Sequence, residues 1–379
     1  MRSFLRPALA GLVLAALTGA CGKESIAPKS LANPQATSAQ LASLDTMFNA
    51  APLHSFSAVS ASIQPTAPAP LPALALASAV NPLTQSSDLR PYARRILAAR
   101  TFARLIPQMS VRATAALFPV GVVGKTFEWD LGTSAYVATA RTGAPSTGVR
   151  FILYAINELT GQPANPLVEV GYIDLIDETG SGSPKLHIIV AGVGGTPVYV
   201  NYTVTLSSQT ANSATITTAG YITNGASSPD SVRFNGSISA SGNATSISVT
   251  EDVSFDINSR DIHVRDWQQA TVTQTSASLR VSFRFEHGGE GVTLDGALNV
   301  DQTAGTVSGT ITSKVDGGLF ATCTVTGTST SFSLTCTGAD ADGLNADEQA
   351  ALHHLGDAVE RIGTLFQGIL APAIGVLGA

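Results

Sequence analysis

Cysteines are the residues whose type and spacing in this chain most directly suggest chemistry. Cys323 and Cys336 flank two runs of β-prone residues that surround a small, polar centre. If a hairpin turns at Ser329 and Thr330, residues whose numbers sum to 659 face each other, and the two cysteines do so. This register predicts a cross-strand disulfide, provided that the local Cα spacing suits it. The alternative is a pair of buried thiols in neighbouring strands.

Other reactive side chains form no motif that carries catalysis or binds a metal. Gly124-Lys125-Thr126 lacks the earlier glycine of a phosphate-binding loop, and the glycine of Asp340-Ala341-Asp342-Gly343 comes too early for a calcium loop. Asp174 and Asp177 close a β-prone run, where turn aspartates are ordinary. The six histidines are scattered along the chain. We therefore expect no catalytic residue, no metal and no cofactor, and hence no enzyme.

The first twenty residues have the composition of a secretory signal. Arg2 and Arg6 precede an uncharged apolar run, residues 8–17, and small residues follow it. The run is about ten residues long, whereas a membrane-spanning helix needs roughly 20. The pattern therefore predicts a signal peptide that is removed on export.

This charged start, the apolar run and the sequence Leu17-Thr18-Gly19-Ala20-Cys21 resemble the lipobox of bacterial lipoprotein precursors. The resemblance covers this segment alone. It implies cleavage before Cys21, diacylation of that cysteine, and a lipid-modified Cys21 as the mature N-terminus. Thr18 stands where the family usually has leucine, which leaves cleavage by an ordinary signal peptidase open.

Length and charge restrict what the exported part can be. Removal of the signal leaves 359 of the 379 residues, enough for a substantial core. The formal charge of −6 becomes −8 once Arg2 and Arg6 are lost, which excludes a general nucleic-acid partner because such a surface is basic. An oxidising compartment outside the cytoplasm is consistent with the Cys323–Cys336 disulfide.

Short β-prone runs fill the chain from about residue 125 to residue 340. Turn signals such as Asn224-Gly225, Gly288-Gly289 and Asp316-Gly317-Gly318 separate them every ten to fifteen residues. No helical pattern lies between the runs, so the connections are expected to be antiparallel. We predict a mainly β fold, an antiparallel meander that forms a barrel or half-barrel with helices near the N- and C-termini packed on it.

Helical patterns lie at the two ends of this region. Ser38 can cap a short helix near the N-terminus, and residues 87–109 form an arginine-rich helical pattern. Near the C-terminus, Asn345 and Glu348 have the spacing of a capping box, and an apolar stripe follows at helical spacing. Pro372 should end or kink that helix.

The predicted divisions are a signal peptide (1–20), a flexible tether (21–36), a helical and proline-rich N-terminal region (37–118), a β domain (119–340) and a C-terminal amphipathic helix packed on it (341–379).

The predicted role is that of an exported protein of the cell envelope, periplasmic or on the cell surface, held to the membrane through lipid on Cys21. Three functional classes follow from these features. The curled sheet could bind an apolar small molecule or a lipid. Alternatively, the protein could be a structural or surface-interaction lipoprotein without a ligand, which its weakly charged, Ser/Thr-rich strands favour. An enzyme is the third class, and it has no motif.

Overall fold

The fold is mainly β, with one large sheet and two described helices. This computed structural model describes residues 28–46, 55–56, 116–157, 159–210, 212–225, 231–243, 245–301, 303–328 and 332–378. The signal peptide, Cys21 and the arginine-rich segment 87–109 lie outside the described residues.

The elements follow one another in a simple order along the chain. The helices are α1 (Pro34–Thr46) and α4 (Ala346–Gly378), and two short 3-10 turns are η1 (Val193–Gly195) and η2 (Asn258–Arg260). The strands are β1 (Thr126–Asp130), β2 (Ala135–Thr139), β3 (Gly148–Tyr154), β4 (Ile156–Asn157), β5 (Gln162–Pro163), β6 (Glu169–Asp177), β7 (Lys185–Gly192), β8 (Val198–Thr210), β9 (Ser213–Thr223), β10 (Ser231–Gly242), β11 (Ser246–Ile257), β12 (Ile262–Thr273), β13 (Ser276–His287), β14 (Glu290–Asp301), β15 (Thr306–Val315), β16 (Gly318–Thr328) and β17 (Phe332–Gly338).

Fifteen of these strands form one sheet, in the order β17 through β6 and then β3-β1-β2. From β6 to β17 every strand pairs antiparallel with its neighbour in sequence, as the absence of intervening helices predicts. The pairing of β1 with β3 is parallel and was not predicted. The mainly β, antiparallel fold class is therefore confirmed.

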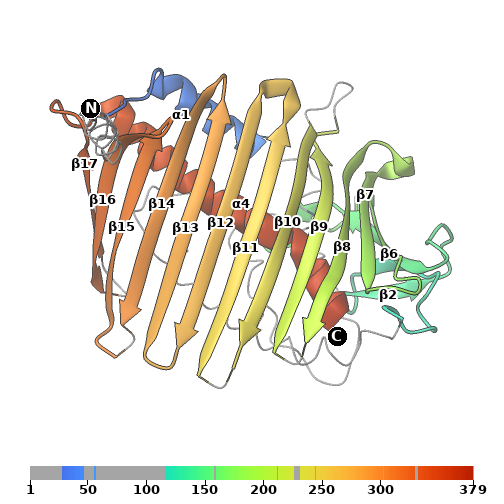
Figure 1. The fold of residues 1–379 in the computed structure, drawn as a ribbon. Helices are drawn as coiled ribbons and strands as arrows, with labels where there is room; N and C mark the ends of the chain where they lie inside the picture. Colours follow the sequence, from blue (N-terminus) through green and yellow to red (C-terminus); the bar gives the residue numbers. More distant parts are fainter. Residues whose placement is uncertain are drawn as a thin grey trace, which may run out of the picture.

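The barrel or half-barrel is the part of the prediction that is wrong. Among the described residues the sheet runs open from β17 to β2, and it is not strongly curled. A barrel buries its apolar face by closing on itself. Here α4 lies diagonally across one face of the open sheet (Figure 1), so that face is covered without closure.

Two-residue turns set the register of the hairpins at one end of the sheet. Gly288 and Gly289 join β13 to β14 with φ values of 59° and 82°, and Asp316 and Gly317 join β15 to β16 with φ values of 44° and 84°. Two central residues with positive φ are typical of type I′ turns, whose twist matches that of the flanking strands.

The C-terminal helix begins as its sequence predicts. The Asn345 amide donates to the Glu348 carboxylate at 3.0 Å, and the Glu348 amide donates to the Asn345 side chain at 3.0 Å, which is a reciprocal capping box. Leu355 is fully buried in the same apolar core as the strand residues. Pro372 lies inside the helix and does not end it.

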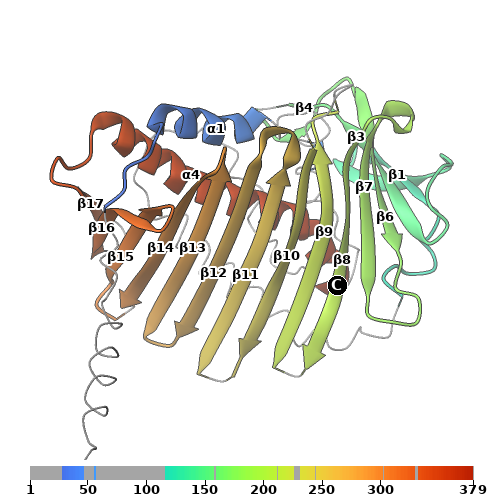
Figure 2. The same ribbon diagram turned by 45° about the horizontal axis from the view of Figure 1, so that its top comes forward.

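The N-terminal helix begins earlier than predicted. Its cap is Asn33, whose side chain accepts a hydrogen bond from the Ala36 amide at 2.9 Å, and not Ser38. Pro34 takes the first helical position, where its fixed φ fits and its missing N–H costs nothing. Helix α1 lies along one end of the strands, beside the first turns of α4 (Figure 2).

Candidate functional site

The two faces of the sheet differ sharply in polarity. Along β12 the side chains of Ile262 and Val264 are buried in the core, whereas those of His263 and Arg265, which alternate with them, reach solvent. The same alternation continues along β13, where Phe283 and Phe285 are buried and Arg284 is exposed. We call the polar side the outer face and the side that carries α4 the inner face. Binding of a polar partner would take place on the outer face.

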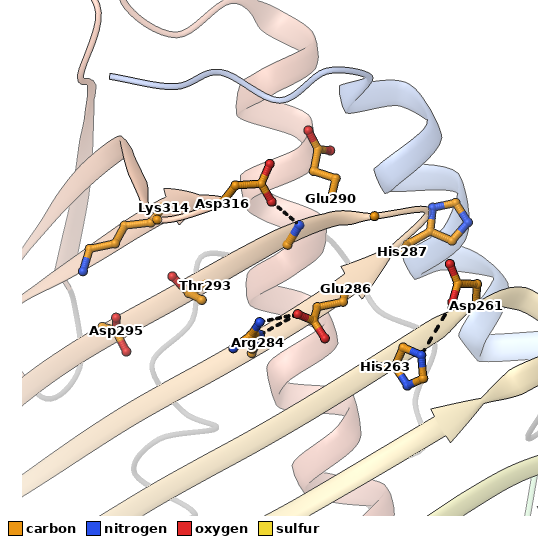
Figure 3. Close-up of a pocket in the computed structure, with 13 residues that line it drawn as sticks. Asp261, His263, Arg284, Glu286, His287, Glu290, Thr293, Asp295, Lys314 and Asp316 are labelled. Atoms are coloured by element: carbon orange, nitrogen blue, oxygen red, sulfur yellow. Dashed lines mark hydrogen bonds and ion pairs between the residues drawn. The ribbon is translucent and has the colours of Figure 1, made fainter. Parts of the chain in front are cut away.

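A depression of about 570 Å³ lies on the outer face, close to the turns that join β11 to β12, β13 to β14, and β15 to β16. We call it the outer-face hollow (Figure 3). It is lined by charged and polar residues and by glycines, namely Asp261, His263, Arg284, Glu286, His287, Gly289, Glu290, Gly291, Thr293, Asp295, Lys314, Asp316 and Gly317.

Strand register places these residues side by side. His263 on β12 lies opposite Glu286 on β13, and Thr293 on β14 lies opposite Lys314 on β15. The Gly288-Gly289 turn then brings His287 opposite Glu290. His263, Glu286, Thr293 and Lys314 fall on one side of the pleat. His287 and Glu290 are the terminal residues of their strands, beside the turn, and so they line the same hollow from its rim.

Carboxylates outnumber cations in the lining, but several are already engaged. The Asp316 side chain forms an ion pair with Lys29 and accepts a hydrogen bond from the Gly291 amide at 2.7 Å. These contacts, that with Lys29 first, lower the pKa of Asp316 from its usual value. Glu286 forms an ion pair with Arg284 on the same strand. The hollow is thus a network of exposed ion pairs with an excess of negative charge.

His263 is held between two aspartates. Its Nδ1 atom lies 2.7 Å from Asp256 on β11, and its Nε2 atom lies 3.6 Å from Asp261 in the turn before β12. The hydrogen bond with Asp256 raises the pKa of His263, and the charges of Asp261 and Glu286 act in the same direction. Protonation of this histidine therefore strengthens the contacts that hold the β11–β12 turn.

The side chains of the lining can bind a polar partner through charge and hydrogen bonds. The lining offers carboxylates, a guanidinium, an ammonium and imidazoles to a polar partner, but neither serine nor cysteine as a nucleophile beside a base. Within the described ranges, no group of three or more His, Cys, Asp or Glu side chains could hold a metal ion. No helix in the described part of the chain is long and apolar enough to cross a membrane.

The structure brings together the two cysteines that the sequence pairs. Cys323 on β16 lies opposite Cys336 on β17, with a Cα–Cα distance of 4.0 Å and an S–S bond of 2.05 Å. The disulfide ties the edge strand β17 to its neighbour. Asp174, in contrast, forms a two-pronged ion pair with Arg150 at 2.7 Å for each contact, which is a structural role.

Sequence reasoning missed the hollow, although a signal for it was present. The argument that faces Cys323 with Cys336 also applies to neighbouring hairpins. In the β12–β13 hairpin, facing residues have numbers that sum to 549, which pairs His263 with Glu286. Histidines that are scattered along the chain can thus be brought near carboxylates by register alone.

The fold and the hollow define a class of architecture: an open antiparallel sheet with a helix across its apolar face and a charged depression on its polar face. No protein-family description, curated protein or solved structure matches this chain.

Proposed function

We propose that this protein is an exported lipoprotein, anchored to the membrane through Cys21, whose outer sheet face is an interaction surface. In this proposal the outer-face hollow is the contact point for a polar, charged partner. The signal-like N-terminus and the segment that resembles a lipobox support the anchor.

The observation that supports an interaction surface is the difference between the two faces of the sheet, one apolar and buried and the other polar and exposed. The inner face belongs to the apolar core, which includes Leu355 and Ala358 of α4 as well as Phe283 and Phe285 of β13. The outer face of these strands is polar and accessible, and its mixed charges favour a specific, electrostatically complementary partner. Because the inner face is buried in the protein's own core, the outer face is the one that can bind a partner.

Site-specific photocrosslinking in intact envelopes tests this proposal. A photoreactive side chain replaces Thr293, which lines the hollow, or Thr310, which lies on the outer face of β15 but not in the hollow. A discrete crosslinked product at position 293, weak at position 310 and reduced by Arg284→Glu, supports the proposal. Equal products at both positions, or products that ignore Arg284→Glu, contradict it.

Binding of an apolar ligand or lipid between the sheet and α4 is the second candidate. It is favoured by the polar groups buried within the otherwise apolar inner face. Asp266 is fully buried and accepts a hydrogen bond from Gln268, and Glu251 lies opposite Gln268 on the neighbouring strand. Apolar sites commonly carry a few such groups that orient a ligand. Native mass spectrometry of protein taken from its own envelope would detect a retained lipid; protein of unliganded mass contradicts this candidate.

A further inference from the structure

The segment that leads into α1 is attached to one particular end of the sheet. The Lys29 amide donates to the Leu319 carbonyl oxygen at 2.9 Å, where β16 starts, and the Lys29 side chain forms an ion pair with Asp316. The Ala32 amide donates to the Glu290 carboxylate at 2.8 Å, where β14 starts. Residues 29–32 are therefore held along the ends of the strands that border the outer-face hollow.

Further contacts fix this segment from both sides. Leu31 is 6% exposed and belongs to the apolar core, and Ser30 donates to the Asp340 carboxylate at 3.1 Å. Asn33 then caps α1. The position of Lys29 relative to the sheet is thus determined by its neighbours, and the chain before Lys29 must start from this corner.

The length of chain between Lys29 and the proposed lipid anchor is short. Cys21 precedes Lys29 by eight residues, which span at most about 29 Å when fully extended. Strand β12 has 12 residues, so the two ends of the sheet are roughly 40 Å apart. Lipid on Cys21 therefore limits the distance between Lys29 and the bilayer to less than the length of one strand.

We propose that the strand-end surface, formed by residues 29–32 and the turns 258–261, 287–290 and 316–317, is the face that this protein presents to the membrane that carries its anchor. The inference rests on the proposed lipidation of Cys21. This surface carries three carboxylates (Asp261, Glu290 and Asp316) and two cations (Lys29 and Arg260), so its net charge is small and the tether, not attraction to anionic headgroups, holds it near the bilayer. The outer-face hollow then opens beside the membrane surface, within reach of groups that project from it.

Energy transfer from the protein to labelled lipid tests this orientation. A fluorescent side chain replaces Ser259 or Thr275, which lie in the turns before and after β12 and are both exposed. The full-length lipidated protein is reconstituted in phosphatidylcholine vesicles that contain an acceptor-labelled headgroup. We expect transfer at position 259 to be at least about twofold higher than at position 275, because the two turns are separated by about 40 Å along the strand. Equal or reversed transfer overturns the orientation.

Two controls separate the orientation from the anchor. Vesicle flotation and the intact mass report lipidation, and Cys21→Ser should abolish flotation; wild-type protein that does not float and carries no acyl chains overturns both proposals. Floating protein with equal transfer overturns the orientation alone. Insertion of about twenty Gly/Ser residues after Gly22 should reduce the difference between the two positions, because a flexible linker of that length no longer restricts the sheet.

Discussion

Two regions of the outer face, one on β3 and β6 and the other on β11 to β15, contain ion pairs in different surroundings. In the β3–β6 region, Arg150 on β3 forms an ion pair with Asp174 on β6, and their side chains are only 19% and 10% exposed. The Arg150 guanidinium also lies 3.6 Å from the centre of the Tyr172 ring. The Arg150–Asp174 pair has little contact with water, and β3, which carries Arg150, is buried along nearly its whole length.

In the β11–β15 region the ion pairs are exposed to solvent. The side chains of Arg265 and Asp252 are 63% and 36% exposed, and those of Arg284 and Glu286 are 60% and 37% exposed. Exposed pairs of this kind contribute little to stability and can exchange partners. The comparison indicates that the mostly buried Arg150–Asp174 pair holds the fold together, whereas the exposed pairs of the β11–β15 region are available for binding.

Asp174→Asn should have the largest effect on stability. It removes the negative partner of a mostly buried guanidinium, which typically costs about 3–5 kcal/mol in the free energy of unfolding. Urea unfolding followed by circular dichroism measures the change. If Asp174→Asn lowers the free energy of unfolding no more than the loss of an exposed pair does, the two regions do not differ as described.

Loss of the disulfide should have the next largest effect. The double variant Cys323→Ser with Cys336→Ser opens a loop of 13 residues' separation and should lower the free energy of unfolding by about 2–3 kcal/mol, chiefly because the unfolded chain gains entropy. Reduction of the wild-type protein should produce the same loss. A reduced protein as stable as the oxidised one would show that the edge strand does not depend on its covalent link.

Arg265→Ala should have a small effect on stability. It breaks the exposed pair with Asp252, and the expected cost is below about 1 kcal/mol. The same urea measurement serves as the matched control for Asp174→Asn. If Arg265→Ala lowers the free energy of unfolding about as much as Asp174→Asn does, the ion pairs of the β11–β15 region also stabilise the fold.

The smallest predicted effect is a dependence on pH through His263. Its pKa is raised in the folded protein, so its contribution to stability is fully present below the unfolded value of about 6.5 and is lost as the pH rises through the folded pKa. His263→Gln should therefore destabilise the protein more at about pH 5.5 than at about pH 8. His353→Gln, an exposed position on α4, is the control. An equal cost of His263→Gln at both pH values contradicts the prediction.

The parts of the fold that local chemistry decides could be predicted from the sequence. Turn residues and alternating polarity located the meander, the capping box located the start of α4, and hairpin register located the disulfide. The capping box succeeds because its two hydrogen bonds join residues three apart, so that no distant part of the chain is needed to form them.

Features that depend on distant parts of the chain could not be predicted. The parallel contact of β1 with β3 is limited to residues 126–127 and 150–151, and its strands carry no signal of that partner. Closure into a barrel was wrong: the sequence predicted a C-terminal helix packed on the sheet, but it carries no local signal of how strongly a sheet of this many strands curls. The hollow depends on four consecutive strands, and so it becomes visible only when their registers are combined.

The unbroken order of strands from β6 to β17 also has a consequence for how the chain folds. Every pairing in this part of the sheet joins adjacent strands, so each new strand can add to the one before it as the chain emerges N-terminus first. Local contacts of this kind close with little loop entropy. Helix α4 follows all of these strands in the sequence, and until it is made the inner face of the meander lacks that cover. The most vulnerable species during synthesis is therefore a sheet that still lacks α4, and any chaperone requirement should peak just before this 33-residue helix is released.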